Sequence, residues 1–353
     1  MKIEKLALML VTTLVSSATA AVVSAQTVFI PEGSANSVLA VSAEGGKSIR
    51  RIEGLDSVHG LSGANEKGIL VVGSLSEVEG IGQDDIKPEN ISAEDHEAHH
   101  GSSSGQKSSR QGPTSILSIV RSDTGDVVRT IAVPGAVHHT AVSSDERFAV
   151  ATHPSEGGIS IVDLASFKLE SFVPTGSSPN YAVLGAAANL VYVSNAGNGT
   201  ISEVDLDKGI VLRNFPVNHV PEHMVMNVQD NILYAADSDA GLVVELDIAT
   251  GKTLRSFKLD GEIHGLDLAS DGDRLLVSGT GTDKLNSIDL NTGEVVHVPL
   301  SPSPYHLTAV QGTNRVFVSS RAEPIVWILD ADSLKVEKAI EIQGEGHQMT
   351  VMR

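Results

Sequence analysis

Histidines recur in this chain at a nearly constant interval, and each precedes a similar short apolar segment. Imidazole changes charge near neutral pH and is also the commonest metal ligand in proteins. The interval is about 42 residues, one position carries tyrosine instead, and the seven positions are His59, His138, Tyr181, His223, His264, His306 and His347. If they converge, their neutral rings would hold a transition metal, zinc in the first place and copper as an alternative.

The six histidines are expected at one register of a repeated strand, with no more than four of them bound to zinc at once. His139, beside His138, is a further candidate ligand. The competing interpretation is that the repeat propagates a turn-capping histidine whose ring nitrogen bonds a neighbouring carbonyl. Affinity for metal should fall as the pH drops through about 6.5, where free imidazole protonates.

A second group of histidines lies in an insertion. The step from His59 to His138 is 79 residues, and the surplus covers about residues 80–112. This stretch contains Glu94-Asp95-His96-Glu97-Ala98-His99-His100 and is otherwise rich in serine, glycine and charge. Such a composition predicts a flexible loop that binds metal weakly. His96, His99 and His100 are therefore expected to collect metal for the site formed by the ring.

Other residue types narrow the chemistry. The chain has no cysteine, which excludes disulfides, thiolate metal sites and covalent c-type haem attachment. Methionines lie beside His223 and His347, and their thioethers could bind copper. On a strand, however, packing between blades is the simpler role for them. Some further residues are expected near the site as partners that orient the rings, namely His153, His219, Glu222, Glu262 and Glu345.

The elements that must position these residues are short strands. A strand ending in aspartate recurs at Asp163, Asp205, Asp247, Asp289 and Asp330, and a second apolar strand precedes each one. Turn residues separate the strands and no helix-length amphipathic segment intervenes, so the fold class is all-β. A repeat of about 40 to 45 residues with four antiparallel strands is the blade of a β-propeller. Seven axial strand starts predict seven blades.

The two ends of the chain are expected to complete one blade. Residues 27–31 form its second strand, and residues 348–352 at the C-terminus supply its axial strand, which leaves no open sheet edge. Residues 26–353 then form one propeller domain. Residues 1–25 have the charged start, apolar run and small-residue end of a secretory signal, so we expect a periplasmic protein with no membrane segment beyond the signal.

Charge and motifs limit the functional classes. The formal net charge of −19 argues against nucleic acid and suits cations or a basic protein surface. Hydrolase and phosphate-binding motifs do not stand out, so an enzyme is uncertain and a non-enzyme is favoured. A monomer is expected.

The repeat resembles the YVTN-repeat propellers, through Val191-Tyr192-Val193-Ser194-Asn195 and through Asp247-Ile-Ala-Thr250-Gly251-Lys252. This resemblance implies the seven-bladed fold. The histidine ring and the histidine-rich segment together resemble periplasmic zinc-chaperone propellers, which load the solute-binding protein of a zinc ABC transporter. That resemblance implies a zinc metallochaperone with such a partner. The alternatives are a non-catalytic scaffold for protein–protein interaction and a haem-handling or lactonase-like propeller.

Overall fold

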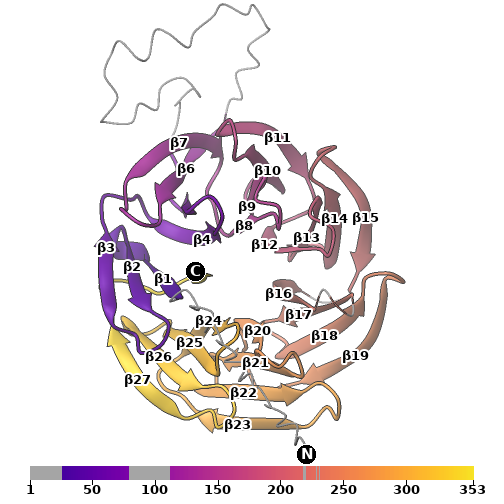
Figure 1. Cartoon of the computed structure of the whole chain (residues 1–353). Coiled ribbons are helices and arrows are strands. Elements are labelled where there is room, and N and C mark those ends of the chain that lie inside the picture. The colour runs from indigo at the N-terminus through magenta and orange to yellow at the C-terminus, as the bar shows by residue number, and fades with distance from the viewer. Residues whose placement is uncertain (1–25, 79–111, 218–219, 228, 230) are drawn as a thin grey trace, which may run out of the picture.

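The computed structural model describes residues 26–78, 112–217, 220–227, 229 and 231–353. These residues form seven four-stranded antiparallel sheets arranged around a central axis (Figure 1). The predicted all-β, seven-bladed propeller is confirmed. Apart from the short 3-10 turn η1 (Gly33–Ala35), the described residues contain no helix, and none of their elements is a helix that could cross a membrane.

Each blade runs from an axial strand to a peripheral one. The first three blades, in this order, are β28 (Thr350–Met352), β1 (Thr27–Glu32), β2 (Ser37–Ser42) and β3 (Ser48–Ile52); β4 (Val58–Ala64), β5 (Ile69–Ser74), β6 (Thr114–Arg121) and β7 (Val127–Pro134); and β8 (Thr140–Val142), β9 (Phe148–His153), β10 (Gly158–Asp163) and β11 (Lys168–Pro174).

The remaining four blades follow the same plan. They are β12 (Pro179–Leu184), β13 (Leu190–Asn195), β14 (Thr200–Asp205) and β15 (Ile210–Pro216); β16 (Pro221–Asn227), β17 (Ile232–Asp237), β18 (Leu242–Asp247) and β19 (Lys252–Lys258); β20 (Leu266–Leu268), β21 (Arg274–Gly279), β22 (Lys284–Asp289) and β23 (Val295–Pro299); and β24 (Pro304–Val310), β25 (Arg315–Ser320), β26 (Ile325–Asp330) and β27 (Val336–Glu341).

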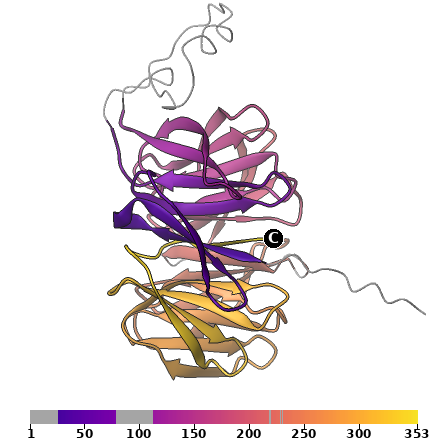
Figure 2. The same ribbon diagram turned by 60° about the vertical axis from the view of Figure 1, so that its left-hand side comes forward.

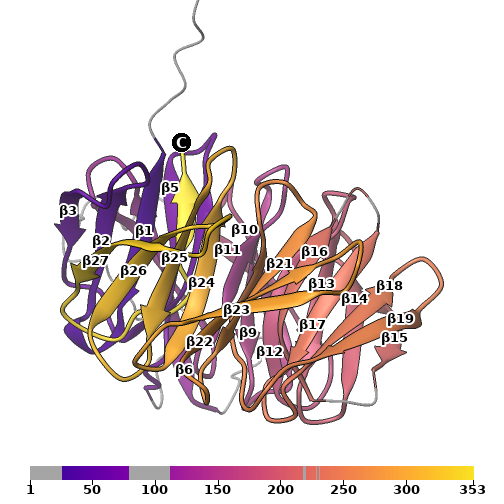
Figure 3. The same cartoon turned by 90° about the horizontal axis from the view of Figure 1, so that it is seen from below.

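The core lies between neighbouring blades. The two middle strands of a blade are apolar on both faces, so each face packs against the blade beside it. Val150 and Ile161 of the third blade share one buried cluster with Val191 and Val204 of the fourth. Peripheral strands are exposed along most of their length, as in β19. The arrangement gives a short, wide cylinder, which Figure 3 shows from the side.

The predicted closure of the ring by the C-terminal strand is confirmed, with β28 beginning at Thr350. Thr27 pairs with Met352 and Phe29 with Thr350 in an antiparallel register. Figure 2 shows the C-terminal end lying against the first strands. Closure gives the first blade its axial strand, so that all seven blades have four strands.

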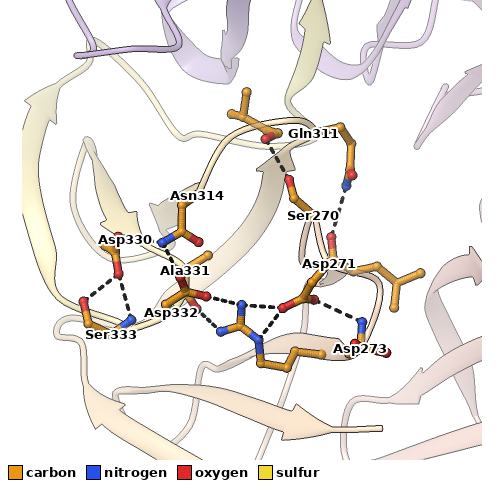
Figure 4. A network of polar contacts seen from close by, with 12 residues as sticks. Ser270, Asp271, Asp273, Gln311, Asn314, Asp330, Ala331, Asp332 and Ser333 are labelled. Carbon is orange, nitrogen blue, oxygen red and sulfur yellow. Dashed lines mark hydrogen bonds and ion pairs between the residues drawn. The ribbon is translucent and has the colours of Figure 1, made fainter.

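The face opposite the histidines carries structural turns. The repeated aspartates accept hydrogen bonds from backbone N–H groups just beyond their strands, as Asp330 does from Ser333 at 2.8 Å, so the predicted capping role holds. Between the last two blades, Arg274 bonds Asp271 at 2.7 Å and the carbonyl of Ala331 at 2.6 Å, and it also pairs with Asp332 (Figure 4). This network joins neighbouring blades.

Candidate metal centre on the propeller axis

Each blade begins its axial strand with a β-bulge. In β16 the two residues Glu222 and His223 lie opposite the single residue Ala236, and similar register shifts occur in β4, β12 and β24. Just before β8, His138 N donates to the carbonyl of Thr152, and Thr152 N donates in turn to the carbonyl of His139. Because two residues of a bulge face one partner residue, each blade presents two consecutive side chains to the axis.

The bulges build two layers of side chains. The first bulge residues form what we call the outer layer, on the face where second and third strands connect. Its members are His59, His138, Asn180, Glu222, His264, Tyr305 and His347. The second bulge residues form the inner layer, one step further into the channel. Its members are Gly60, His139, Tyr181, His223, Gly265, His306 and Gln348.

The expectation of a single histidine register is therefore wrong, although the predicted convergence on the axis is confirmed by the ring contacts described below. His223 and His306 belong to the inner layer, while His59, His138, His264 and His347 belong to the outer one. His139 takes the inner place that the prediction gave to His138. Alternation of apolar residues cannot reveal a bulge, because the extra residue shifts the register without changing the strand that follows.

Three inner histidines form the most compact group. His139, His223 and His306 each offer a ring nitrogen, and these nitrogens lie within 4.8 Å of one another. The three residues are 0%, 3% and 3% exposed, and each Nε2 is buried without a hydrogen-bond partner. Their ring centroids are 4.7 to 5.5 Å apart. The competing interpretation, in which a ring nitrogen bonds a neighbouring backbone carbonyl, describes Nδ1 of His59 and of His139 but not these Nε2 atoms.

One backbone bond fixes the tautomer of His139. Its Nδ1 lies 2.9 Å from the carbonyl oxygen of Asn180, and a carbonyl only accepts, so Nδ1 carries the proton. In a neutral ring Nε2 then keeps its lone pair and points toward His223 and His306. A carbonyl that holds the second ring nitrogen in this way is the usual support of a metal-binding histidine.

The outer layer is a row of stacked rings. The His59 ring lies 4.6 Å from that of His138 and 4.0 Å from that of His347, and the His264 ring stacks on Tyr305 at 4.0 Å. His138, His264, His347 and Tyr305 are partly exposed. His59 is 6% exposed, and its Nδ1 lies 2.6 Å from the carbonyl of His138.

Hydroxyl groups on the second strands hold the bulges in place. Thr152 Oγ1 accepts a bond from His139 N at 3.0 Å and donates to the carbonyl of Asn180, in the next blade, at 2.9 Å. Ser194 and Ser278 make the equivalent pairs of bonds. The sequence analysis missed these residues, although a hydroxyl at the end of the second strand recurs in the repeat and could have marked them.

Two glycines and one glutamine fill the inner layer between the histidines. A Cβ at Gly60 would lie 3.0 Å from the backbone of His139, and one at Gly265 would lie 2.6 Å from the carbonyl oxygen of Tyr305 and 3.0 Å from His306 Cα. Glycine thus lets the next histidine backbone approach the axis. The Gln348 side chain accepts from Leu61 N and Thr140 N and donates to Thr140 O, so it ties three blades together.

Burial keeps the histidines neutral. Desolvation, with smaller contributions from neighbouring imidazoles, holds the pKa of His139, His223 and His306 well below 6.5. The same two causes lower the pKa of His138 to about 4 and that of His347 to about 3. Neutral imidazole is the form that binds metal. With these pKa values, protonation should compete with metal binding at the buried rings only at a pH lower than the value of about 6.5 expected for free imidazole.

A cavity of about 420 Å³ lies on the inner side of this centre. Its lining residues include Tyr181, His223, His306 and Gln348. Asp267, the second residue of β20 in the sixth blade, lines it as well. Burial raises the pKa of Asp267 to about 6, and its carboxylate accepts a bond from Ala309 N at 2.8 Å. The centre can thus be reached from the channel as well as from the outer layer.

Other predicted residues do not join the group. His153 ends β9 and is fully buried, with Nδ1 3.1 Å from the carbonyl of Ala136 and Nε2 2.9 Å from Ser160 Oγ. Glu262 pairs with Arg321 at 3.3 Å, and Glu345 accepts from Ser34 N. Met224 and Met349 are buried in the core. His96, His99, His100, His219 and residues 1–25 lie outside the described residues.

Comparisons with known proteins agree on the fold. Residues 190–322, fewer than half of the chain, match the family model PQQ_2, described as outer membrane protein assembly factor BamB. No curated protein sequence matches the chain.

Two solved structures are similar over most of the chain. The dihydro-heme d1 dehydrogenase NirN in complex with DHE is 12% identical with a TM-score of 0.62, over 89% of this chain and 63% of that one. The Kuenenia stuttgartiensis hydrazine synthase is 14% identical with a TM-score of 0.66, over 89% and 92%. At these identities the likeness shows the propeller fold alone. The finer resemblance to YVTN-repeat and zinc-chaperone propellers stays a prediction.

Proposed function

We propose that this protein binds a transition metal, zinc in the first place, through His139, His223 and His306, and that it carries the metal rather than using it in catalysis. The observation that supports the proposal is the group of three buried histidines, each with a ring nitrogen within 4.8 Å of the others and each with an Nε2 atom that is buried without a hydrogen-bond partner. An unsatisfied buried polar group costs about 1 to 3 kcal/mol. Three such groups close together favour a bound metal ion that would take up their lone pairs.

The residues fit zinc. Zinc–nitrogen bonds of about 2.1 Å place tetrahedral ligand atoms about 3.4 Å apart. From a separation of at most 4.8 Å, the three nitrogens must therefore close by at most about 1.4 Å, which side-chain rotation can supply. Three protein ligands leave a fourth position. The cavity beside His223 and His306 gives an incoming ligand access to it, and such access suits a carrier that must release its metal.

Location and partner belong to the same proposal. A signal-like N-terminus and a net charge of −19 suit a periplasmic protein that concentrates cations. The resemblance to zinc-chaperone propellers points to a solute-binding protein of a metal ABC transporter as the recipient. Copper is the alternative cargo.

The test is metal titration of the purified, metal-free mature chain. Zinc affinity is measured by competition with a chromophoric chelator, and cobalt absorption reports whether the site is tetrahedral. His139→Gln, His223→Gln and His306→Gln should each weaken binding about 10- to 100-fold or more. The matched control is His297→Gln, an exposed histidine on the peripheral strand β23. Absence of tight binding by the unaltered chain, or equal effects of control and inner variants, refutes the proposal.

A haem-handling function is the second candidate, and the outer layer is the observation that favours it. Its stacked rings from His138 through His59 to His347 offer a partly exposed aromatic surface. NirN, which shares the fold, was solved in complex with DHE. Haemin titration distinguishes the two, because a Soret shift abolished by His347→Gln and retained by His306→Gln would place a tetrapyrrole on the outer layer.

A further inference from the structure

The outer layer surrounds the inner triad on the side of solvent. Each inner ring contacts at least one outer ring: His139 lies 4.4 Å from His138, and His223 lies 4.2 Å from His264. His306 is flanked on both sides, by His264 at 5.0 Å and by His347 at 5.6 Å. A cation arriving from this face therefore meets imidazoles before it reaches the triad.

We infer that the outer histidines are an entrance relay, which takes the metal from solution and passes it to the inner triad by stepwise ligand exchange. The inference rests on the proposed function. Adjacent rings at 4.0 to 5.6 Å let a metal bind a nitrogen of the next ring before it leaves the last. A bare divalent ion is thereby never moved through an apolar layer, where desolvation would be costly.

Differences between the two layers support separate roles. The inner rings are 0 to 3% exposed, and only their nitrogens, among the described residues, gather within 4.8 Å of one another, as a tight resting site requires. Three of the four outer histidines are partly exposed, namely His138, His264 and His347. Buried nitrogens of His264 and His347 also lack partners, so the outer layer offers free lone pairs but no such gathered site, and it holds a metal only in passing. Acidic residues lie on the same face, with Glu222 in the outer layer itself and Glu345 two residues before His347. Their charge raises the local concentration of cations.

A competing route runs through the channel. Two cavities of about 420 and 340 Å³ share Asp267 as a lining residue, and the second is also lined by Gln229, Asp271 and Gln311. This route offers two carboxylates. Asp267 already accepts two backbone bonds and Asp271 is paired with Arg274, whereas the outer face offers four imidazoles. Imidazole is the better match for zinc, so we assign entrance to the outer layer.

Stopped-flow kinetics of the full mature chain with zinc test the relay. The variant is the pair His264→Gln and His347→Gln, the control is His297→Gln, and Asp267→Asn reports on the channel route. If the outer rings lower the activation free energy of zinc entry by about 1.4 kcal/mol, their loss slows association about tenfold. Dissociation should slow by the same factor, because the metal leaves by the same path, and Kd should then stay within about twofold of the original.

The outcomes separate the two proposals. If the unaltered chain does not bind zinc tightly, the proposed function itself fails. If it binds tightly and the outer pair of substitutions leaves both rates unchanged, the relay fails while the triad stands. Slowing by Asp267→Asn alone would also overturn the relay, in favour of the channel. A rise in Kd with unchanged association would make the outer rings ligands of the resting site, which contradicts the inference equally.

Discussion

Substitution of Gly265 by alanine tests whether close backbone approach builds the metal centre. Gly265 is the second bulge residue of the sixth blade, and it lies against the strand carrying His306. Its N–H donates to the carbonyl of Tyr305 at 3.1 Å. An added Cβ would lie 2.6 Å from that carbonyl oxygen and 3.0 Å from His306 Cα. The atoms it meets belong to the backbone, which cannot rotate away as a side chain can.

The size of the effect follows from these distances. Ordinary contact begins near 3.4 Å, so the start of β24 must move by about 0.8 Å, and His306 moves with it. Overpacking of this kind costs about 1 to 3 kcal/mol of unfolding free energy. Binding sites tolerate misplacement of only about 0.5 Å. We therefore expect zinc affinity to fall about 10- to 100-fold as the His306 nitrogen leaves its position.

Urea unfolding and zinc competition measure the two effects on the same preparation. The control is Gly45→Ala, because Gly45 is exposed and its added Cβ meets no atom within 4 Å. Gly60→Ala, whose closest contact is 3.0 Å from the backbone of His139, is the milder companion if Gly265→Ala does not fold. Zinc affinity and stability equal to the control in both glycine variants would refute the reasoning that glycine admits the histidines to the axis.

Three further results are expected. Thr152→Val should lose about 1 to 3 kcal/mol of unfolding free energy, because it leaves His139 N without its hydroxyl acceptor and removes one of the bonds to the carbonyl of Asn180, whereas Thr253→Val on the exposed strand β19 should not. The metal-free chain should become less stable as the pH falls from about 6.5 toward 4. In that range histidines of the unfolded chain protonate, while His138 of the folded chain, with a pKa of about 4, stays neutral. A urea unfolding midpoint that does not change over this pH range would contradict the prediction. Deleting residues 90–105 should slow metal transfer and leave the tight site intact, and loss of tight binding on deletion would place the site in that segment.

The fold could be predicted from the sequence because each blade repeats the same local signals. The ring is defined by apolar strands of constant spacing and by the aspartate turns that follow them. Its closure is indicated by a C-terminal strand without partners in its own segment, and Thr27 indeed pairs with Met352. The axial location of the histidines followed from the same repeat. The division between His223 and His264, which occupy different layers, was missed because the apolar alternation after the bulge does not reveal it. The spacing to the repeated aspartate does carry it, since Asp247 follows His223 by 24 residues (247 − 223) and Asp289 follows His264 by 25 (289 − 264).

The bulge explains how a repetitive fold produces an asymmetric site. A regular strand would send His138 and His139 to opposite faces, whereas the bulge turns both toward the axis. Seven blades thus supply fourteen positions in two layers, and the sequence fills them unequally. Gly60 and Gly265 leave room at the inner level for His139 and His306, and Gln348 closes the gap beside them while joining the C-terminal strand to the second and third blades.

Because Gln348 both closes the ring and bonds the residue after His139, metal bound by the triad should also stabilise the closed propeller against unfolding. A smaller zinc-induced rise in the unfolding midpoint of Gln348→Ala, matched by weaker zinc affinity, would demonstrate this coupling, and an equal rise with equal affinity in both proteins would disprove it.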